Sequence, residues 1–152
     1  MLNRRETIRR SAAVAGLLAS TGLFPRFAHA FNANAFAAKT LPEALKAYGS
    51  AAAPTESKEV VITGPEIAEN GAVVPIGVST TLAGVKHLLL LVEKNPNTLV
   101  AMFNVSDAVE PNYLTRAKMG QSSDVFAVAI MNDGKALFAK KEIKVTLGGC
   151  GG

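Results

Sequence analysis

The sequence predicts an all-β fold, an antiparallel β-sandwich of the immunoglobulin-like type with about seven strands. Three observations support this prediction. Short apolar segments recur from residue 58 onward with turn residues about every 8 to 12 positions, no helical pattern follows Tyr48, and 142–147 alternates polar with apolar side chains. An OB-like or other small barrel is the competing architecture, because similar short strands also close on themselves.

The chain begins with the features of an export leader. Adjacent Arg4 and Arg5 precede a moderately apolar run over 11–24, and 28–30 (Ala-His-Ala) has the small-x-small pattern of a cleavage site. This order is typical of a twin-arginine signal peptide, so we expect 1–30 to be removed and the mature protein to act in the periplasm. The apolar run is shorter than the about 20 residues of a membrane span, so we expect no membrane segment after cleavage.

Removal of the leader changes the charge of the protein. Five of the 16 basic residues and one of the 12 acidic residues lie in it, which leaves 11 of each and a formal net charge of zero. Overall basicity therefore gives no argument for binding to nucleic acid or to an anionic membrane. The remaining 122 residues are enough for one domain whose core needs no disulfide.

Residues 31–57 are expected to form an N-terminal segment with one short helix. The Ala- and Asn-rich stretch 31–39 predicts loose or partial order. Thr40 and Glu43 have the spacing of a capping box, which predicts a helix that begins there and ends near Tyr48. The apolar face of this helix, which should pack on the domain, comprises Leu41, Leu45 and Tyr48.

The β domain is expected over 58–147. The dipeptide 70–71 (Asn-Gly) predicts a hairpin turn, as does 132–134 (Asn-Asp-Gly), and Pro75 restricts its strand to a sheet edge or a bulge. The near-continuous apolar run 85–93 indicates a central strand. The predicted strands span 59–63, 72–80, 85–93, 98–105, 113–119, 125–131 and 136–147.

The last five residues, 148–152, place the only cysteine of the chain, Cys150, between glycine pairs. Glycine has no Cβ and adopts both signs of φ, so this end predicts a flexible arm that carries the thiol roughly 10 Å from the last strand. Nothing local lowers the thiol pKa from about 8.5, which favours a cysteine modified by other catalytic sites. A frayed terminus with an incidental cysteine is the alternative. The residues of the predicted arm are Gly148, Gly149, Gly151 and Gly152.

The mature chain lacks the residues of a catalytic or metal site. Its one histidine, His87, lies in an apolar strand, where a histidine that faces solvent or is hydrogen-bonded at the sheet surface is the simpler interpretation. One histidine and one cysteine are too few for a zinc site, and no phosphate-binding or HExxH motif occurs. We therefore expect no enzyme activity, no cofactor and no metal. An enzyme that pairs Cys150 with His87 is the weakest of the alternatives.

Three segments resemble a known family: 65–71 (PEIAENG), 93–97 (EKNPN) and, above all, 145–152 (VTLGGCGG). Together with the twin-arginine leader, they resemble the SoxY family, the sulfur-carrier subunits of the periplasmic thiosulfate-oxidising Sox system. The resemblance implies that Cys150 holds thiosulfate-derived adducts covalently, as an S-thiosulfonate and as sulfane sulfur. The four arm glycines would let Cys150 enter the active sites of several enzymes.

The same resemblance implies partners. A SoxZ-like β-sandwich subunit would form a heterodimer with the chain, and SoxXA-, SoxB- and SoxCD-like enzymes would bind it transiently. One alternative is an exported, non-catalytic binding module in which Cys150 joins two copies through a disulfide. Whether the strand lysines hold anionic adducts is open, although a solvated strand face is the simpler interpretation. These lysines are Lys140, Lys141 and Lys144.

Overall fold

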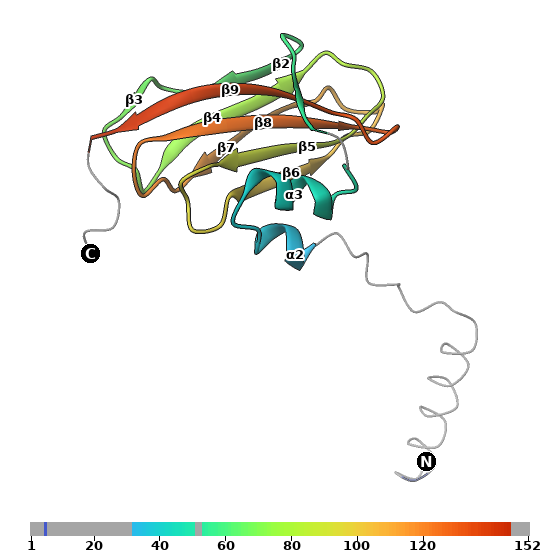
Figure 1. The fold of residues 1–152 in the computed structure, drawn as a ribbon, viewed down its shortest axis with the longest axis horizontal. Coiled ribbons are helices and arrows are strands. Elements are labelled where there is room, and N and C mark those ends of the chain that lie inside the picture. The colour runs from blue at the N-terminus through green and yellow to red at the C-terminus, as the bar shows by residue number, and fades with distance from the viewer. Residues whose placement is uncertain (1–4, 6–31, 51–52, 147–152) are drawn as a thin grey trace. The chain divides into compact units, whose positions relative to one another are not determined.

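The computed structural model describes residues 5, 32–50 and 53–146. All of its described helices and strands belong to the compact unit that begins at Asn32. In that unit nine strands form two sheets, so the predicted all-β sandwich is confirmed, with short helices before it (Figure 1). The elements are α2 (Ala33–Phe36), α3 (Leu41–Ala47), β1 (Thr55–Glu56), β2 (Val60–Thr63), β3 (Ile67–Ala68), β4 (Val74–Thr80), β5 (Val85–Val92), β6 (Leu99–Asn104), β7 (Asn112–Ala117), β8 (Ser123–Met131) and β9 (Ala136–Val145).

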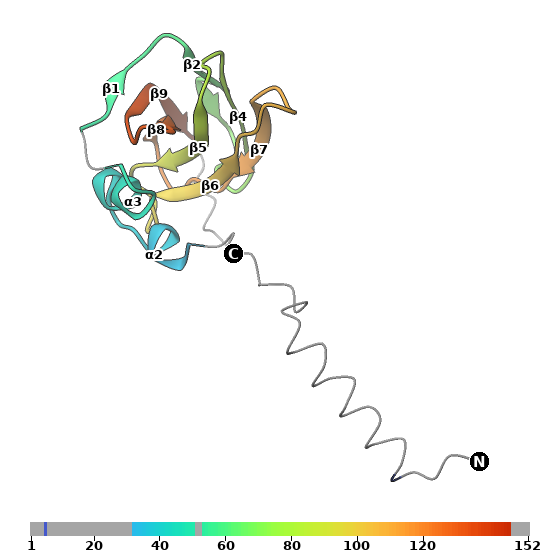
Figure 2. The same ribbon diagram turned by 90° about the vertical axis from the view of Figure 1, so that its right-hand side faces the viewer.

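The two sheets differ in size. The large sheet has the order β1-β9-β8-β5-β6, with β3 also pairing with β9, and the small sheet has the order β2-β4-β7. Strands β5, β6, β8 and β9 pair in antiparallel fashion, whereas β1 and β3 run parallel to β9. Both helices lie on the side of the large sheet that faces away from the small one (Figure 2). No described helix is long and apolar enough to cross a membrane.

Strand β5 explains how this architecture has two cores. Its alternate residues Leu88, Leu90 and Val92 pack between the sheets. Leu89 and Leu91 point to the opposite face, where they pack under the helices. Because β5 is buried on both faces and lies between β8 and β6, its sequence is apolar without alternation. The prediction of a central strand at 85–93 is confirmed.

The predicted helix is present, and a second helix precedes it. Thr40 caps α3, accepting a hydrogen bond at Oγ1 from the Glu43 backbone N–H (3.4 Å). The Glu43 carboxylate accepts from the N–H of Lys39 (2.9 Å), one residue before the position that a capping box predicts. Helix α2 was not predicted, because 31–39 shows no helical periodicity. Tertiary packing stabilises it, since Ala35 is fully buried in the core beneath the helices.

The hairpin predicted at 70–71 is wrong. Strand β3, which precedes this dipeptide, pairs with β9 and not with β4. The Asn70 side chain instead accepts from the N–H of Ala72 (2.9 Å), and Gly71 accepts from the N–H of Met119 (2.7 Å). The turn therefore carries the chain from one sheet to the other. The second predicted turn is confirmed, with Gly134 at φ +86° between β8 and β9.

The edge position predicted from Pro75 is wrong for its strand as a whole. Strand β4 lies between β2 and β7, so it is the central strand of the small sheet. Strand β2 pairs only with 77–80 of β4, however, and Pro75 has β7 as its only neighbouring strand, where it lies opposite Arg116. Proline has no backbone N–H to donate. It is tolerated at position 75 because no strand lies on the β2 side of β4 at this point, so no hydrogen bond to a second strand is lost.

Candidate functional site at the base of the carrier arm

The predicted carrier arm, Gly148 to Gly152 with Cys150 at its centre, lies outside the described residues. The structure does describe the segment from which it continues, here called the arm base, residues 143–146. Ile143 is fully buried between the sheets, whereas Lys144 and Thr146 are exposed. The alternation predicted for this strand is confirmed as far as Thr146.

Backbone hydrogen bonds hold the arm base on both sides. On one side, Lys144 donates its N–H to the carbonyl of Glu66 (2.9 Å), and Thr146 donates to that of Ala68 (3.1 Å). On the other side, the N–H of Val145 donates to the hydroxyl of Ser122 (2.9 Å). The arm base is therefore fixed by the β3 segment and by the connection between β7 and β8, as its place at the end of a sheet strand predicts.

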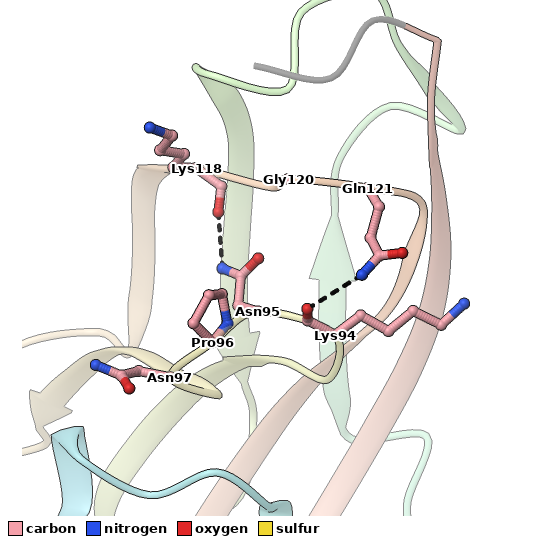
Figure 3. Close-up of a pocket in the computed structure, with 7 residues that line it drawn as sticks. All are labelled: Lys94, Asn95, Pro96, Asn97, Lys118, Gly120 and Gln121. Atoms are coloured by element: carbon pink, nitrogen blue, oxygen red, sulfur yellow. Dashed lines mark hydrogen bonds between the residues drawn. The ribbon is translucent and has the colours of Figure 1, made fainter. Parts of the chain in front are cut away.

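A cleft of about 530 Å³ lies beside this connection (Figure 3). The loop between β5 and β6 forms one wall and the loop between β7 and β8 forms the other. Two hydrogen bonds hold the walls together: Asn95 Nδ2 donates to the Lys118 carbonyl (2.7 Å), and Gln121 Nε2 donates to the Lys94 carbonyl (3.5 Å). Gln121 lines the cleft and directly precedes Ser122, which binds the arm base. The cleft and the arm base therefore lie at the same end of the sandwich. The described residues that line the cleft are Lys94, Asn95, Pro96, Asn97, Lys118, Gly120 and Gln121.

The described part of the cleft is basic and amide-rich. Lys94 and Lys118 are exposed and flank it, with their side chains extending in opposite directions (Figure 3). Lys39 adds a third amino group at its edge, where Nζ donates to Asn97 Oδ1 (2.7 Å). None of the described lining residues is acidic, and the ion pairs found among the described residues use other lysines.

The other side of the arm base is apolar. Ile67, which pairs with Lys144, exposes 57% of its surface. Glu66 and Glu69 are exposed in the same segment. The end of the sandwich from which the arm continues thus has a basic cleft on one side and an apolar, acidic segment on the other.

Two of the three strand lysines already have partners. Lys140 forms an ion pair with Asp124 (3.2 Å) on the neighbouring strand, and Lys141 donates to the carbonyl of Gly64 (2.6 Å). Only Lys144, which lies in the arm base, has no such bond among the described residues. This arrangement favours a structural role for Lys140 and Lys141 over the holding of adducts.

His87 is hydrogen-bonded at the surface of the large sheet, as the simpler interpretation of the sequence predicts. Its Nδ1 is hydrogen-bonded to Asn104 Oδ1 on β6 (2.9 Å), and its ring lies 5.2 Å from that of Tyr48. Burial lowers the pKa of His87, the hydrogen bond with Asn104 opposes this change, and the charge of Lys86 adds to it. His87 also lies near the start of β5, at the end of the sandwich opposite the cleft, which is formed after Val92.

No group of three or more histidine, cysteine, aspartate or glutamate side chains could hold a metal ion in the described part of the chain. The sequence carries no pattern that marks the cleft. Residues 93–97 resemble a family segment and indicate a turn, but Lys118 is far away in the sequence and carries no signal of its own. Hydrogen bonds that no sequence pattern marks, such as that from Asn95 to the Lys118 carbonyl and that from Gln121 to the Lys94 carbonyl, bring the two loops together.

Comparisons with known proteins agree with this geometry. The structure of the sulfur carrier protein SoxY from Chlorobium limicola f thiosulfatophilum matches with a TM-score of 0.64 and 32% sequence identity, over 71% of this chain and 97% of that one. A single-substitution form of superoxide reductase (neelaredoxin) from Ignicoccus hospitalis matches with a TM-score of 0.50 and 22% identity, over 57% of this chain and 78% of that one. The second likeness shows the fold alone. No curated protein sequence matches the chain.

The family comparison covers both the sandwich and its C-terminal end. The model of the family described as sulfur oxidation protein SoxY matches residues 44–150, from α3 through the arm base to the cysteine. The match thus includes the described sandwich core, the cleft loops and Cys150. On this match and the similarity to the solved SoxY structure, the chain belongs to the SoxY family.

Proposed function

We propose that this protein is the covalent sulfur carrier of thiosulfate oxidation and that Cys150 holds the intermediates. The observation that carries the proposal is that the family match reaches residue 150, the only cysteine of the chain. The bonded arm base supports it, because a carrier thiol needs a fixed point of attachment next to the residues that move between enzymes.

The chemistry requires little of the carrier beyond its thiol. In the first step, the Cys150 thiol joins the sulfane sulfur of thiosulfate to give an S-thiosulfonate. One proton is released, and a SoxXA-like haem protein accepts the electron pair. A SoxB-like hydrolase then adds water to the terminal sulfone, which releases sulfate and leaves a sulfane sulfur on the cysteine.

The remaining sulfane sulfur is removed in the same way. A SoxCD-like enzyme oxidises it to a sulfonate with oxygen from water and accepts the electrons. Hydrolysis by the SoxB-like enzyme releases a second sulfate and restores the thiol. We propose that the carrier itself is not an enzyme, needs no cofactor, and presents its adducts from a heterodimer with a SoxZ-like subunit.

The proposed location is the periplasm. The paired arginines, apolar run and Ala-His-Ala site of 1–30 support export by the twin-arginine pathway. That pathway transports folded proteins, so a partner subunit without a leader of its own would be exported together with this chain. Oxidation of an exposed thiol in this compartment is a hazard, which a covalent sulfur adduct limits.

The test is the intact mass, without reductant, of the mature protein purified from its own periplasm during growth on thiosulfate. We expect masses of the thiosulfonate, sulfane or polysulfide forms, and we expect Cys150→Ser to lack all of them. Free thiol and a disulfide-linked dimer as the only forms would overturn the proposal. They would favour the exported binding module that uses Cys150 for intermolecular disulfides.

A further inference from the structure

We propose that the arm-base end of the sandwich is a docking surface for the pathway's enzymes, and that an acidic rim around the enzyme's active-site entrance contacts the cleft between Lys94 and Lys118. This inference rests on the proposed carrier function. It concerns how an enzyme recognises the folded body of the carrier and is separate from the chemistry at the cysteine.

The short reach of the arm requires a docking surface close to it. Cys150 is the fifth residue after Val145, the last residue of β9. A fully extended chain spans at most about 3.3–3.6 Å per residue, so Cys150 reaches about 17 Å beyond Val145. A catalytic group that acts on the adduct must come within that distance of Val145. An enzyme with a recessed active site therefore covers the end of the sandwich around the arm base.

The charge of the cleft indicates the chemistry of the enzyme surface. Lys94 and Lys118 are exposed, and neither is in an ion pair among the described residues, so both are free to meet carboxylates. The side chains extend in opposite directions and flank the cleft (Figure 3). One small anion would need converging donors, whereas flanking amino groups suit a broad acidic surface that lies across both walls.

Two exposed apolar side chains at the same end of the sandwich complete the surface. Ile67 and Val73 are two of the five exposed large hydrophobic side chains among the described residues. Ile67 lies across the arm base from the cleft, whereas Val73 directly precedes Val74, which pairs with Ala117 next to the Lys118 wall. An enzyme seated over the arm base and the cleft would therefore bury both side chains. Charged groups at the rim would speed association, and apolar contacts beside them would hold the complex together.

The test is sulfate release from the loaded carrier, in complex with its partner subunit, by the purified SoxB-like hydrolase of the same organism. Reaction of the Cys150 thiolate with tetrathionate loads the carrier, because the thiolate attacks a central sulfur, forms the S-thiosulfonate and displaces thiosulfate. Intact mass verifies equal loading of every variant. The test variant is Lys94→Gln with Lys118→Gln, and its control is Lys58→Gln with Lys86→Gln, two exposed lysines at the opposite end of the sandwich.

We expect the test variant to raise KM about 3- to 10-fold and to leave kcat at saturation within about twofold, because two rim charges together contribute up to about a tenfold change in affinity. Added salt should raise the KM of the wild type more than that of the variant. The control variant should keep the wild-type KM.

Four outcomes would overturn the docking surface. An unchanged KM in the test variant, or an equal increase in the control variant, would show that the cleft is not recognised. A lower kcat with an unchanged KM would show that the cleft serves the carrier's own arm or adduct. Failure of the hydrolase on loaded wild-type carrier would contradict the proposed function itself, and the docking surface with it.

Discussion

At the scale of single residues, His87 makes the stability of the fold depend on pH. Burial lowers the pKa of His87 from its ordinary value of 6.5, despite the hydrogen bond with Asn104. The unfolded chain then binds a proton more readily than the folded chain. The free energy of unfolding should therefore fall as the pH decreases from about 6.5 toward the folded-state pKa and should lose nothing more through this group below it.

The measurement is urea unfolding of the wild type and of His87→Gln at about pH 7.5 and about pH 5. Glutamine cannot titrate, so the wild type should lose more stability than the variant on acidification. Equal losses in both proteins would show that the proton affinity of His87 is the same folded and unfolded.

The residues of the candidate site differ in how far the sequence predicts them. Cys150 is evident from composition alone, since it is the only cysteine and lies between glycines. Lys94 and Lys118 are not evident, because residue spacing gives no information on which loops meet at one end of a sandwich. Their proximity depends on the Asn95 side chain and on Ser123, which accepts from the N–H of Lys94 (3.0 Å).

At the scale of elements, Ser122 is the side-chain contact that holds the end of β9. Its hydroxyl accepts from the N–H of Val145. Ser122→Ala should cost about 1 kcal/mol locally, because one hydrogen bond is lost while β3 still holds the other side. Amide exchange at Val145 should then become about fivefold faster. Exchange measured by NMR, with exposed Ser106→Ala as the control, checks this; equal rates in both variants would contradict it.

The sequence predicted those helices and strands that have their own hydrophobic pattern or their own helix-capping residue. The seven longer strands and α3 are of this kind. Strands β1 and β3 have two residues each and exist only because β9 offers them a partner, so no local pattern marks them. Helix α2 likewise depends on the packing of Ala35. The hairpin prediction at 70–71 was wrong for a related reason. A dipeptide specifies a turn, but it does not specify which sheet the chain enters after the turn.

At the scale of the whole molecule, the helices cover one face of the large sheet and create the second core. Leu45 of α3 is 2% exposed there, whereas Leu114 on the outer face of the small sheet is 78% exposed. Leu45→Ala should lower the free energy of unfolding by about 2–5 kcal/mol through lost burial and the cavity that remains. Leu114→Ala should change it by less than about 0.5 kcal/mol.

Denaturant unfolding of the two variants checks this contrast. A small loss for Leu45→Ala would mean that the helices contribute little to the stability of the sandwich. Both variants should keep the arm base intact, because neither side chain contacts the β3 segment or the connection that contains Ser122.

The pairing of β9 has a mechanical consequence. This strand is bonded along its length to β8 on one side and, at separate points, to β1 and β3 on the other. On the proposed carrier function, an enzyme that retains an adduct while the carrier diffuses away would put tension on the arm base along the axis of β9. The hydrogen bonds on both of its sides then bear that load together in shear, so the strand resists being peeled from the sheet one bond at a time.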